Sequence, residues 1–229
     1  MKSFKQAYDN IFSLGHDCSV AYQLRENGLI TASGPFDWFA IDDLSVITDN
    51  IEDRFSRFFL PENMSMDTHQ DEKSGYYIYT DTATGIKSFH DIPKSCNNIA
   101  GSLIGLNRKF HRRVDRFFEL IQKGNKTLLI RKIVGGDLTD LTDLSEVLSD
   151  MLPSKCTILG VSHIKIKCVM TTITKMSYDV YVANMDCDSD NSLKRADVPG
   201  NFKSWNRLFQ TFCELANPAP PYALLKGGN

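Results

Sequence analysis

The stretch NIFSLGHDCS, residues 10–19, decides the fold that the sequence predicts. Its first five residues form a short apolar run of the kind found in buried strands. Gly15 then permits a tight turn, and the residues from Asp17 onward have the pattern of a helix that ends at Gly28. A strand that passes through a glycine turn directly into a helix is typical of the first unit of an α/β sheet.

Helical and extended patterns alternate along the rest of the chain. Apolar residues at spacings of three and four predict helices, whereas short apolar runs between turn residues predict strands. The predicted helices cover 44–60, 106–121, 140–151 and 202–215, and the predicted strands cover 76–79, 86–89, 127–134, 156–161, 164–172 and 179–185. Residues 61–75 are polar and unpatterned, which indicates a surface loop.

Together these elements predict an α/β fold built as a single domain over residues 1–229. We expect three layers, in which a mostly parallel, doubly wound, Rossmann-like sheet is covered by helices on both faces. The extended runs on either side of the turn at residues 81–85 predict an additional β-hairpin near residues 76–90, inserted or added at a sheet edge.

The composition excludes several classes of protein. A hydrophobic content of 42% over 229 residues is enough for a core, which excludes a disordered tail or a disulfide-stapled mini-protein. The formal net charge of −2 provides no overall field for nucleic acid or an anionic membrane, so neither is an expected partner. Residues 1–10 lack an apolar signal-peptide segment and no window approaches a membrane span, so we expect a cytoplasmic protein.

Six cysteines are present, and without an export signal we expect reduced thiols rather than disulfides. They contain no CxxC pair and their gaps are long and irregular, so no structural metal site is expected. The chain also lacks a P-loop and a GxGxxG fingerprint, and no cofactor is expected. The remaining question is whether one of the six thiols is a nucleophile.

Cys18 has the sequence setting of a nucleophile. It lies in the first turn of a predicted helix, where free backbone N–H groups and the helix dipole favour a thiolate with a lowered pKa. Ligands of open α/β sheets gather at such strand ends. The neighbouring residues that could bind substrate or stabilise an oxyanion are Gly15, His16, Asp17 and Ser19. The competing interpretation is that Cys18 packs as a small hydrophobic residue beneath its helix.

A nucleophilic cysteine needs a base, and two of the five histidines fit that role. His90 closes a predicted strand and has an acid beside it, whereas His163 follows another predicted strand and lies at its C-terminal end. The residues alone do not separate these two candidates. His16 is too near Cys18 in the sequence to reach the sulfur comfortably.

The segment GPFDW, residues 34–38, contributes two further candidates. Trp38 can either wall a pocket or anchor the loop on the core. Asp37 is the preferred residue to orient the catalytic histidine, because Asp91, adjacent to His90 in a strand, would point to the opposite face.

Several blocks of sequence, in order and spacing, resemble a bacterial family of unknown function that carries a papain-like cysteine peptidase label. The blocks are FSLGHDC at 12–18, GPFDW at 34–38, FHD at 89–91, RRVDRF at 112–117 and LIR at 129–131. The resemblance covers roughly residues 10–135 and implies that Cys18 is the nucleophile and His90 its base. Papain-type enzymes have a different sequence around the cysteine and a more distant histidine, so the fold prediction rests on the helix and strand pattern.

Three hypotheses about function follow. The leading one is a cysteine-dependent hydrolase, either a papain-like peptidase or an acyl-transferring enzyme, that acts on a peptide, acyl or glycan substrate through a Cys-His dyad. The second is a transferase or hydrolase for sugar or phosphate ligands, in which Arg131 and the basic helix at 108–116 bind the ligand and Cys18 is structural. The third is a non-enzymatic interaction module whose aromatic and basic surface binds a partner.

Overall fold

The computed structural model describes residues 5–30, 32–133, 137–164, 172–177, 179–186 and 202–216. The helices are α1 (Ser19–Glu26), α2 (Ser45–Glu52), the short 3₁₀ helix η1 (Pro61–Asn63), α3 (Ile99–Lys123), α4 (Asp137–Met151) and α5 (Phe202–Phe212). The strands are β1 (Gln6–Tyr8), β2 (Asn10–Ser13), β3 (Phe39–Ala40), β4 (Met64–Met66), β5 (Tyr76–Asp81), β6 (Lys87–Pro93), β7 (Lys126–Ile133), β8 (Lys155–Ile164), β9 (Thr172–Lys175), β10 (Val180–Asp186) and β11 (Cys213–Leu215). Within these residues, no helix has the length and apolar character needed to cross a bilayer.

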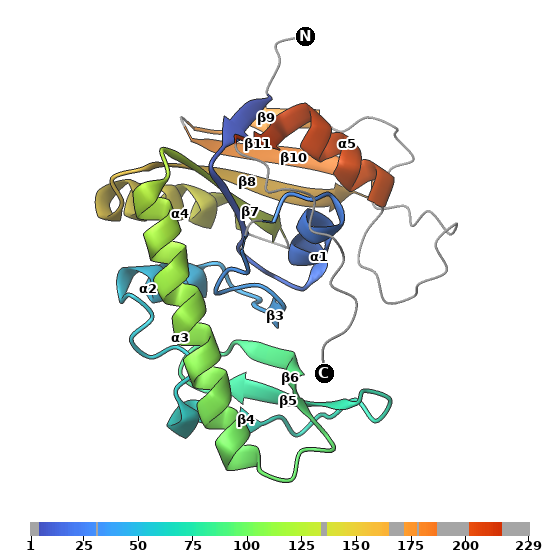
Figure 1. Cartoon of the computed structure of the whole chain (residues 1–229). Coiled ribbons are helices and arrows are strands. Elements are labelled where there is room, and N and C mark those ends of the chain that lie inside the picture. The colour runs from blue at the N-terminus through green and yellow to red at the C-terminus, as the bar shows by residue number, and fades with distance from the viewer. Residues whose placement is uncertain are drawn as a thin grey trace.

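Five strands form the central sheet, in the order β2-β7-β8-β10-β9 (Figure 1). The first four run parallel to one another, and β9 is antiparallel to β10. Asn10 lies beside Thr127, and Thr127 lies beside Cys156, which fixes the register of the first three strands. The prediction of an α/β fold with a mostly parallel sheet is confirmed, and the carboxyl ends of β2, β7 and β8 meet along one edge.

Helices cover both faces of this sheet. One face packs its apolar side chains against α1 and α5, where Leu24 and Trp205 are buried. The other face packs against α2, α3 and α4, where Ile47, Phe117 and Leu144 are buried. Successive residues of a strand point to opposite faces, so the continuous apolar runs of β7 and β8 supply both cores. Each large apolar side chain buried in this way contributes roughly 1.5–3 kcal/mol to stability.

The expected hairpin is present as β5 and β6, which pair antiparallel. It belongs to a separate four-stranded sheet, in the order β3-β6-β5-β4, and does not extend an edge of the parallel sheet. The long helix α3 runs beside both sheets (Figure 1). A cluster of buried phenylalanines packs between the second sheet and α3: Phe36, Phe39, Phe55, Phe58, Phe59 and Phe110.

The predicted helix over 44–60 is too long, because α2 ends at Glu52. Arg54 and Phe55 follow in the left-handed region, with φ of 54° and 58°, and the Phe55 N–H donates to the Asn50 carbonyl over 2.7 Å. Phe55 and Phe58 are buried in the phenylalanine cluster. The two phenylalanines therefore recur at helical spacing because a tight turn buries both side chains, and not because the helix continues.

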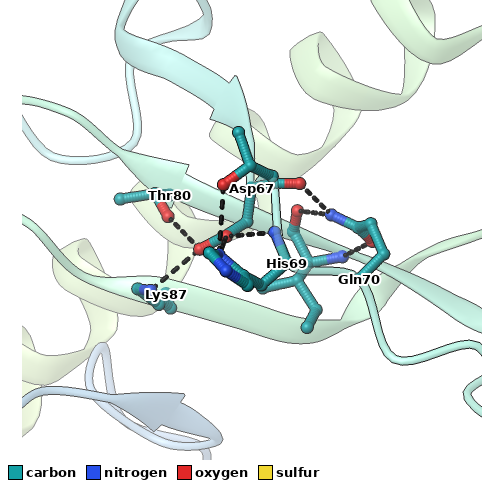
Figure 2. Close-up of polar contacts among 7 residues, drawn as sticks. Asp67, His69, Gln70, Thr80 and Lys87 are labelled. Atoms are coloured by element: carbon teal, nitrogen blue, oxygen red, sulfur yellow. Dashed lines mark hydrogen bonds and ion pairs between the residues drawn. The ribbon is translucent and has the colours of Figure 1, made fainter.

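The polar stretch over 61–75 is more ordered than a plain surface loop, since it contains η1 and β4. Figure 2 shows how it is tied to the second sheet. Asp67 accepts hydrogen bonds from Lys87 Nζ over 2.8 Å and from the His69 N–H over 2.9 Å, which lowers the pKa of Asp67 to about 2. The Gln70 side chain bonds both the N–H and the carbonyl of Ile78, as a neighbouring strand would. The described contacts of His69 are thus with neighbouring residues of this loop, Asp67 among them.

The sequence did not predict the two strands at the ends of the described chain, β1 and β11. β1 pairs in parallel with β11, so Gln6 lies beside Cys213. The predicted helix over 202–215 accordingly ends at Phe212, where β11 begins. Most of the predicted strand over 164–172 lies outside the described residues, while β8 continues without a break to Ile164.

Candidate active site

The turn between β2 and α1 holds Cys18 at the carboxyl edge of the parallel sheet. Gly15 has a φ of +74°, and a Cβ atom there would lie 3.2 Å from the Phe36 carbonyl oxygen and 3.1 Å from the Ile41 side chain. His16 also has a positive φ, 80°, and its carbonyl accepts the Ile41 N–H over 3.1 Å. The turn is thereby packed against the loop that follows the GPFDW segment, and Cys18 stands at the start of α1.

Asp17 ties this turn to the end of β7. Its carboxylate accepts hydrogen bonds from the Ser19 N–H, over 2.8 Å, and from the Ser19 hydroxyl, and it forms an ion pair with Lys132. Burial alone would raise the pKa of Asp17, but the hydrogen bonds from Lys132 and Ser19 outweigh burial and keep that pKa below its ordinary value. Asp17 is therefore a carboxylate held in place by its neighbours.

Cys18 is a half-buried thiol, and the prediction of a lowered pKa is wrong. Burial raises the pKa of the thiol, and the Asp17 carboxylate raises it further, against smaller lowerings by the backbone N–H of Cys18 and by Lys132. The Ser19 N–H, which could have stabilised a thiolate or an oxyanion, is already bonded to Asp17. Cys18 is consequently protonated at neutral pH in this structure.

His163 lies one residue before the end of β8, on the same face of the sheet as Lys132. Lys132 lies beside Val161, two residues before His163, and alternate residues of a strand share a face. The His163 ring meets the edge of Trp205, with ring centroids 5.8 Å apart, and its buried Nε2 has no hydrogen-bond partner among the described residues. Burial and then Lys132 lower the pKa of His163, so the imidazole is neutral. Asp17 opposes this shift.

His90 lies in the second sheet, on β6, and is exposed. A register shift in the β5/β6 pairing falls at this point, so residues 89–91 lie opposite the single residue 78. The His90 ring contacts the rings of Tyr76 and Phe89, with centroids 6.0 and 6.4 Å away. Among the described residues it makes no hydrogen bond or ion pair with Cys18. The structure thus gives Cys18 and His163 the same two charged neighbours, Asp17 and Lys132, and places His90 in the other sheet.

Asp37 and Trp38 join the GPFDW loop to two helices. Asp37 is 1% exposed, accepts the Gly34 N–H over 3.0 Å, and interacts electrostatically with Arg113 and Arg25. Burial raises the pKa of Asp37 to about 7. The Arg25 guanidinium stacks 4.7 Å from the centre of the Trp38 ring. No contact of Asp37 in the described chain is with a histidine, so its expected orienting role has no geometric support.

Arg131 is fully buried and joins two backbone segments. It donates to the Leu14 carbonyl and to the Asp42 carbonyl, each over 3.3 Å. Because strand neighbours face opposite ways, Arg131 points away from the α1 side of the sheet and Lys132 points toward it. Lys132 is the site residue that the sequence reasoning missed, although strand alternation within the same LLIRKIV run could have revealed it.

The residues of this site do not line the cavity near the end of α1. A cavity of about 410 Å³ lies between the end of α1, α5 and β11, and its wall includes Asn27, Phe209 and Cys213. The described His, Cys, Asp and Glu side chains form no cluster of three that could hold a metal ion.

The part of the chain that matches a known family includes every residue of this site. A family model described as "putative papain-like cysteine peptidase" matches residues 9–170. An uncharacterized protein of Acanthamoeba polyphaga mimivirus is 31% identical over 171 residues, which are 66% of this chain and 75% of the viral protein. This relative comes from a virus and not from a bacterium. No solved structure matches the chain.

Proposed function

The chain belongs to the family whose model matches residues 9–170 and is described as "putative papain-like cysteine peptidase", and on this premise we propose that it is a cysteine-dependent hydrolase. In this proposal Cys18 is the nucleophile and His163 is the base. The observation that carries it is the ion pair between Asp17 and Lys132, which fixes the Cys18 turn to the sheet face on which His163 lies.

The proposed reaction is acyl transfer to the sulfur followed by hydrolysis. The Cys18 sulfur attacks the carbonyl carbon of a peptide or acyl substrate while His163 accepts the thiol proton. The bond from that carbon to the leaving nitrogen or oxygen then breaks, and His163 returns the proton to the leaving atom. Water attacks the thioester, His163 takes a proton from the water, and this proton restores the Cys18 thiol as the acid is released.

The protonation states of the two side chains support this mechanism. Burial keeps Cys18 as a thiol and His163 as a neutral imidazole. A neutral thiol and a neutral imidazole are the pair needed when proton transfer accompanies attack on a bound substrate. A preformed thiolate–imidazolium pair is therefore not expected here, in contrast to the thiolate of papain itself.

Hydrolysis of p-nitrophenyl acetate tests the proposal without knowledge of the natural substrate. We expect a burst of p-nitrophenolate and an acetyl group on Cys18, detected by mass spectrometry. The change Cys18→Ala should abolish both, and His163→Gln should slow the burst by about 100-fold or more. Cys96→Ser is the matched control, because Cys96 is a half-buried thiol in contact with Ser102, outside the site.

The variant His90→Gln separates this proposal from the base that the family resemblance implies. We expect the burst of this variant to equal that of the unchanged protein, since the His90 ring contacts Tyr76 and Phe89 in the second sheet. Loss of the burst in His90→Gln with retention in His163→Gln would reverse the assignment of the base. A burst that survives Cys18→Ala would overturn the hydrolase proposal as a whole.

A further inference from the structure

Lys132 occupies a position at which a strand of this sheet otherwise buries apolar side chains. The preceding residues of β7 on the same face, Leu128 and Ile130, are completely buried in the core formed with α1 and α5. Lys132 follows them with only 18% of its side chain exposed. An ammonium group in such a place loses hydration, and an apolar pair in place of Lys132 and its partner Asp17 would often be as stable. Its presence thus points to a role in the site.

The charge of Lys132 acts on each titratable side chain of the site. After burial, the charged groups that act on Cys18 are Asp17, which raises its pKa, and Lys132, which lowers it. The same two residues act on His163, with the same signs. His16 is affected by both and also by Arg131 and Asp42. Beyond burial and the backbone N–H of Cys18, one carboxylate and one ammonium therefore act in opposite directions on the loss of the thiol proton.

We propose that Lys132 is a positioning residue of the active site, which holds Asp17 by an ion pair and compensates the negative charge that Asp17 places beside Cys18. This inference rests on the proposed hydrolase function, because it concerns the reactivity of the same sulfur. Without Lys132, the Asp17 carboxylate next to Cys18 would retain, within the described part of the chain, its bonds to Ser19. The ion pair between Asp17 and Lys132 thus offsets the effect of a carboxylate that lies next to the nucleophile.

The rate of Cys18 alkylation by iodoacetamide, followed by peptide mass mapping from pH 6 to 10, tests this role. In Lys132→Met the midpoint of the pH profile should move up by roughly one unit or more, because an unpaired carboxylate opposes the thiolate. In Asp17→Asn the midpoint should move down. Lys132→Arg should restore the unchanged profile, and the double variant Asp17→Asn/Lys132→Met should lie between the two single variants.

Lys126→Met is the matched control, since Lys126 lies on the same strand but contacts Tyr8 and Gln6 at its other end. A merely structural Lys132 would change the rate equally at every pH and leave the midpoint in place, and this result would overturn the inference. A shift in the same direction in Lys132→Met and Asp17→Asn would also overturn it. If Lys132→Met fails to fold, the double variant Asp17→Asn/Lys132→Met decides the sign: its midpoint should lie above that of Asp17→Asn, and equal midpoints would overturn the inference.

Alkylation does not require turnover, so this experiment and the test of the hydrolase function can fail separately. Opposite shifts without a p-nitrophenolate burst would support the role of Lys132 and overturn the hydrolase proposal. A burst without such shifts would support the hydrolase proposal and overturn the role of Lys132.

Discussion

The substitution Asp37→Asn should remove a large pH dependence of stability. Asp37 is 1% exposed, and burial raises its pKa from 3.8 to about 7 although Arg113 and Arg25 favour the ionised form. The folded protein therefore keeps a proton that the unfolded chain releases above pH 4. The shift of roughly three units corresponds to about 4 kcal/mol, at about 1.4 kcal/mol per unit.

The sign follows from which state binds the proton more tightly. The stabilising contribution of the Asp37 proton is complete below pH 4 and is lost as the pH rises from about 4 to about 7. Asparagine cannot ionise, and its carbonyl oxygen can still accept the Gly34 N–H. We therefore expect the variant to match the unchanged protein near pH 4 and to exceed it by up to about 4 kcal/mol above pH 7.

Urea unfolding at a series of pH values measures this difference. Trp38 fluorescence reports on the loop itself, and Trp205 in α5 reports on the other side of the sheet. His16 and His163 also titrate in this range, but they do so in both proteins and cancel in the difference. Asp43→Asn is the control, because Asp43 is exposed and its pKa is lowered by the Ser45 N–H. Parallel curves for Asp37→Asn and the unchanged protein from pH 4 to 8 would refute the reasoning.

Three further substitutions probe the framework of the site by urea unfolding at constant pH. Arg131→Met removes the donor to two backbone carbonyls and should lower the free energy of unfolding by about 2 kcal/mol or more; unchanged stability would show that those carbonyls find other partners. Gly15→Ala forces a Cβ into a left-handed turn against the Phe36 carbonyl and should lose about 1–3 kcal/mol. Gly28→Ala, which has a similar φ but open space, should lose less, and an equal loss would assign the effect to φ alone. Phe58→Ala empties the centre of the phenylalanine cluster and should lose about 3–5 kcal/mol; a loss below 1 kcal/mol would mean that the cluster collapses around the gap.

Local patterns predicted the elements whose signals are contained in one segment. The stripe from Leu106 to Ile121 is buried along α3 at each predicted position, because an amphipathic helix carries its own periodicity. The strand, glycine turn and helix around Gly15 also agree with the structure. The alternation of such units was sufficient to predict an α/β fold with a mostly parallel sheet.

The remaining differences come from packing between distant segments. The apolar spacing up to Phe58 imitates a helix because a turn buries its phenylalanines against α3 and the second sheet. β1 and β11 are each three residues long and form only by pairing with each other. β4 lies in a polar stretch and owes its place to hydrogen bonds with β5. None of these features has a local signal.

The choice between His90 and His163 also depends on contacts between distant segments, which local sequence patterns do not predict. Both were histidines at the end of a predicted strand, and no local feature separated them. Their strands belong to different sheets, since β6 pairs antiparallel with β5 whereas β8 lies between β7 and β10 in the parallel sheet. Ligands of an α/β sheet gather at the carboxyl ends of its parallel strands, so membership of that sheet matters more than the motif around the histidine. The proposed function accordingly takes the base of Cys18 from β8, so a variant that alters only β6 should leave the chemistry intact.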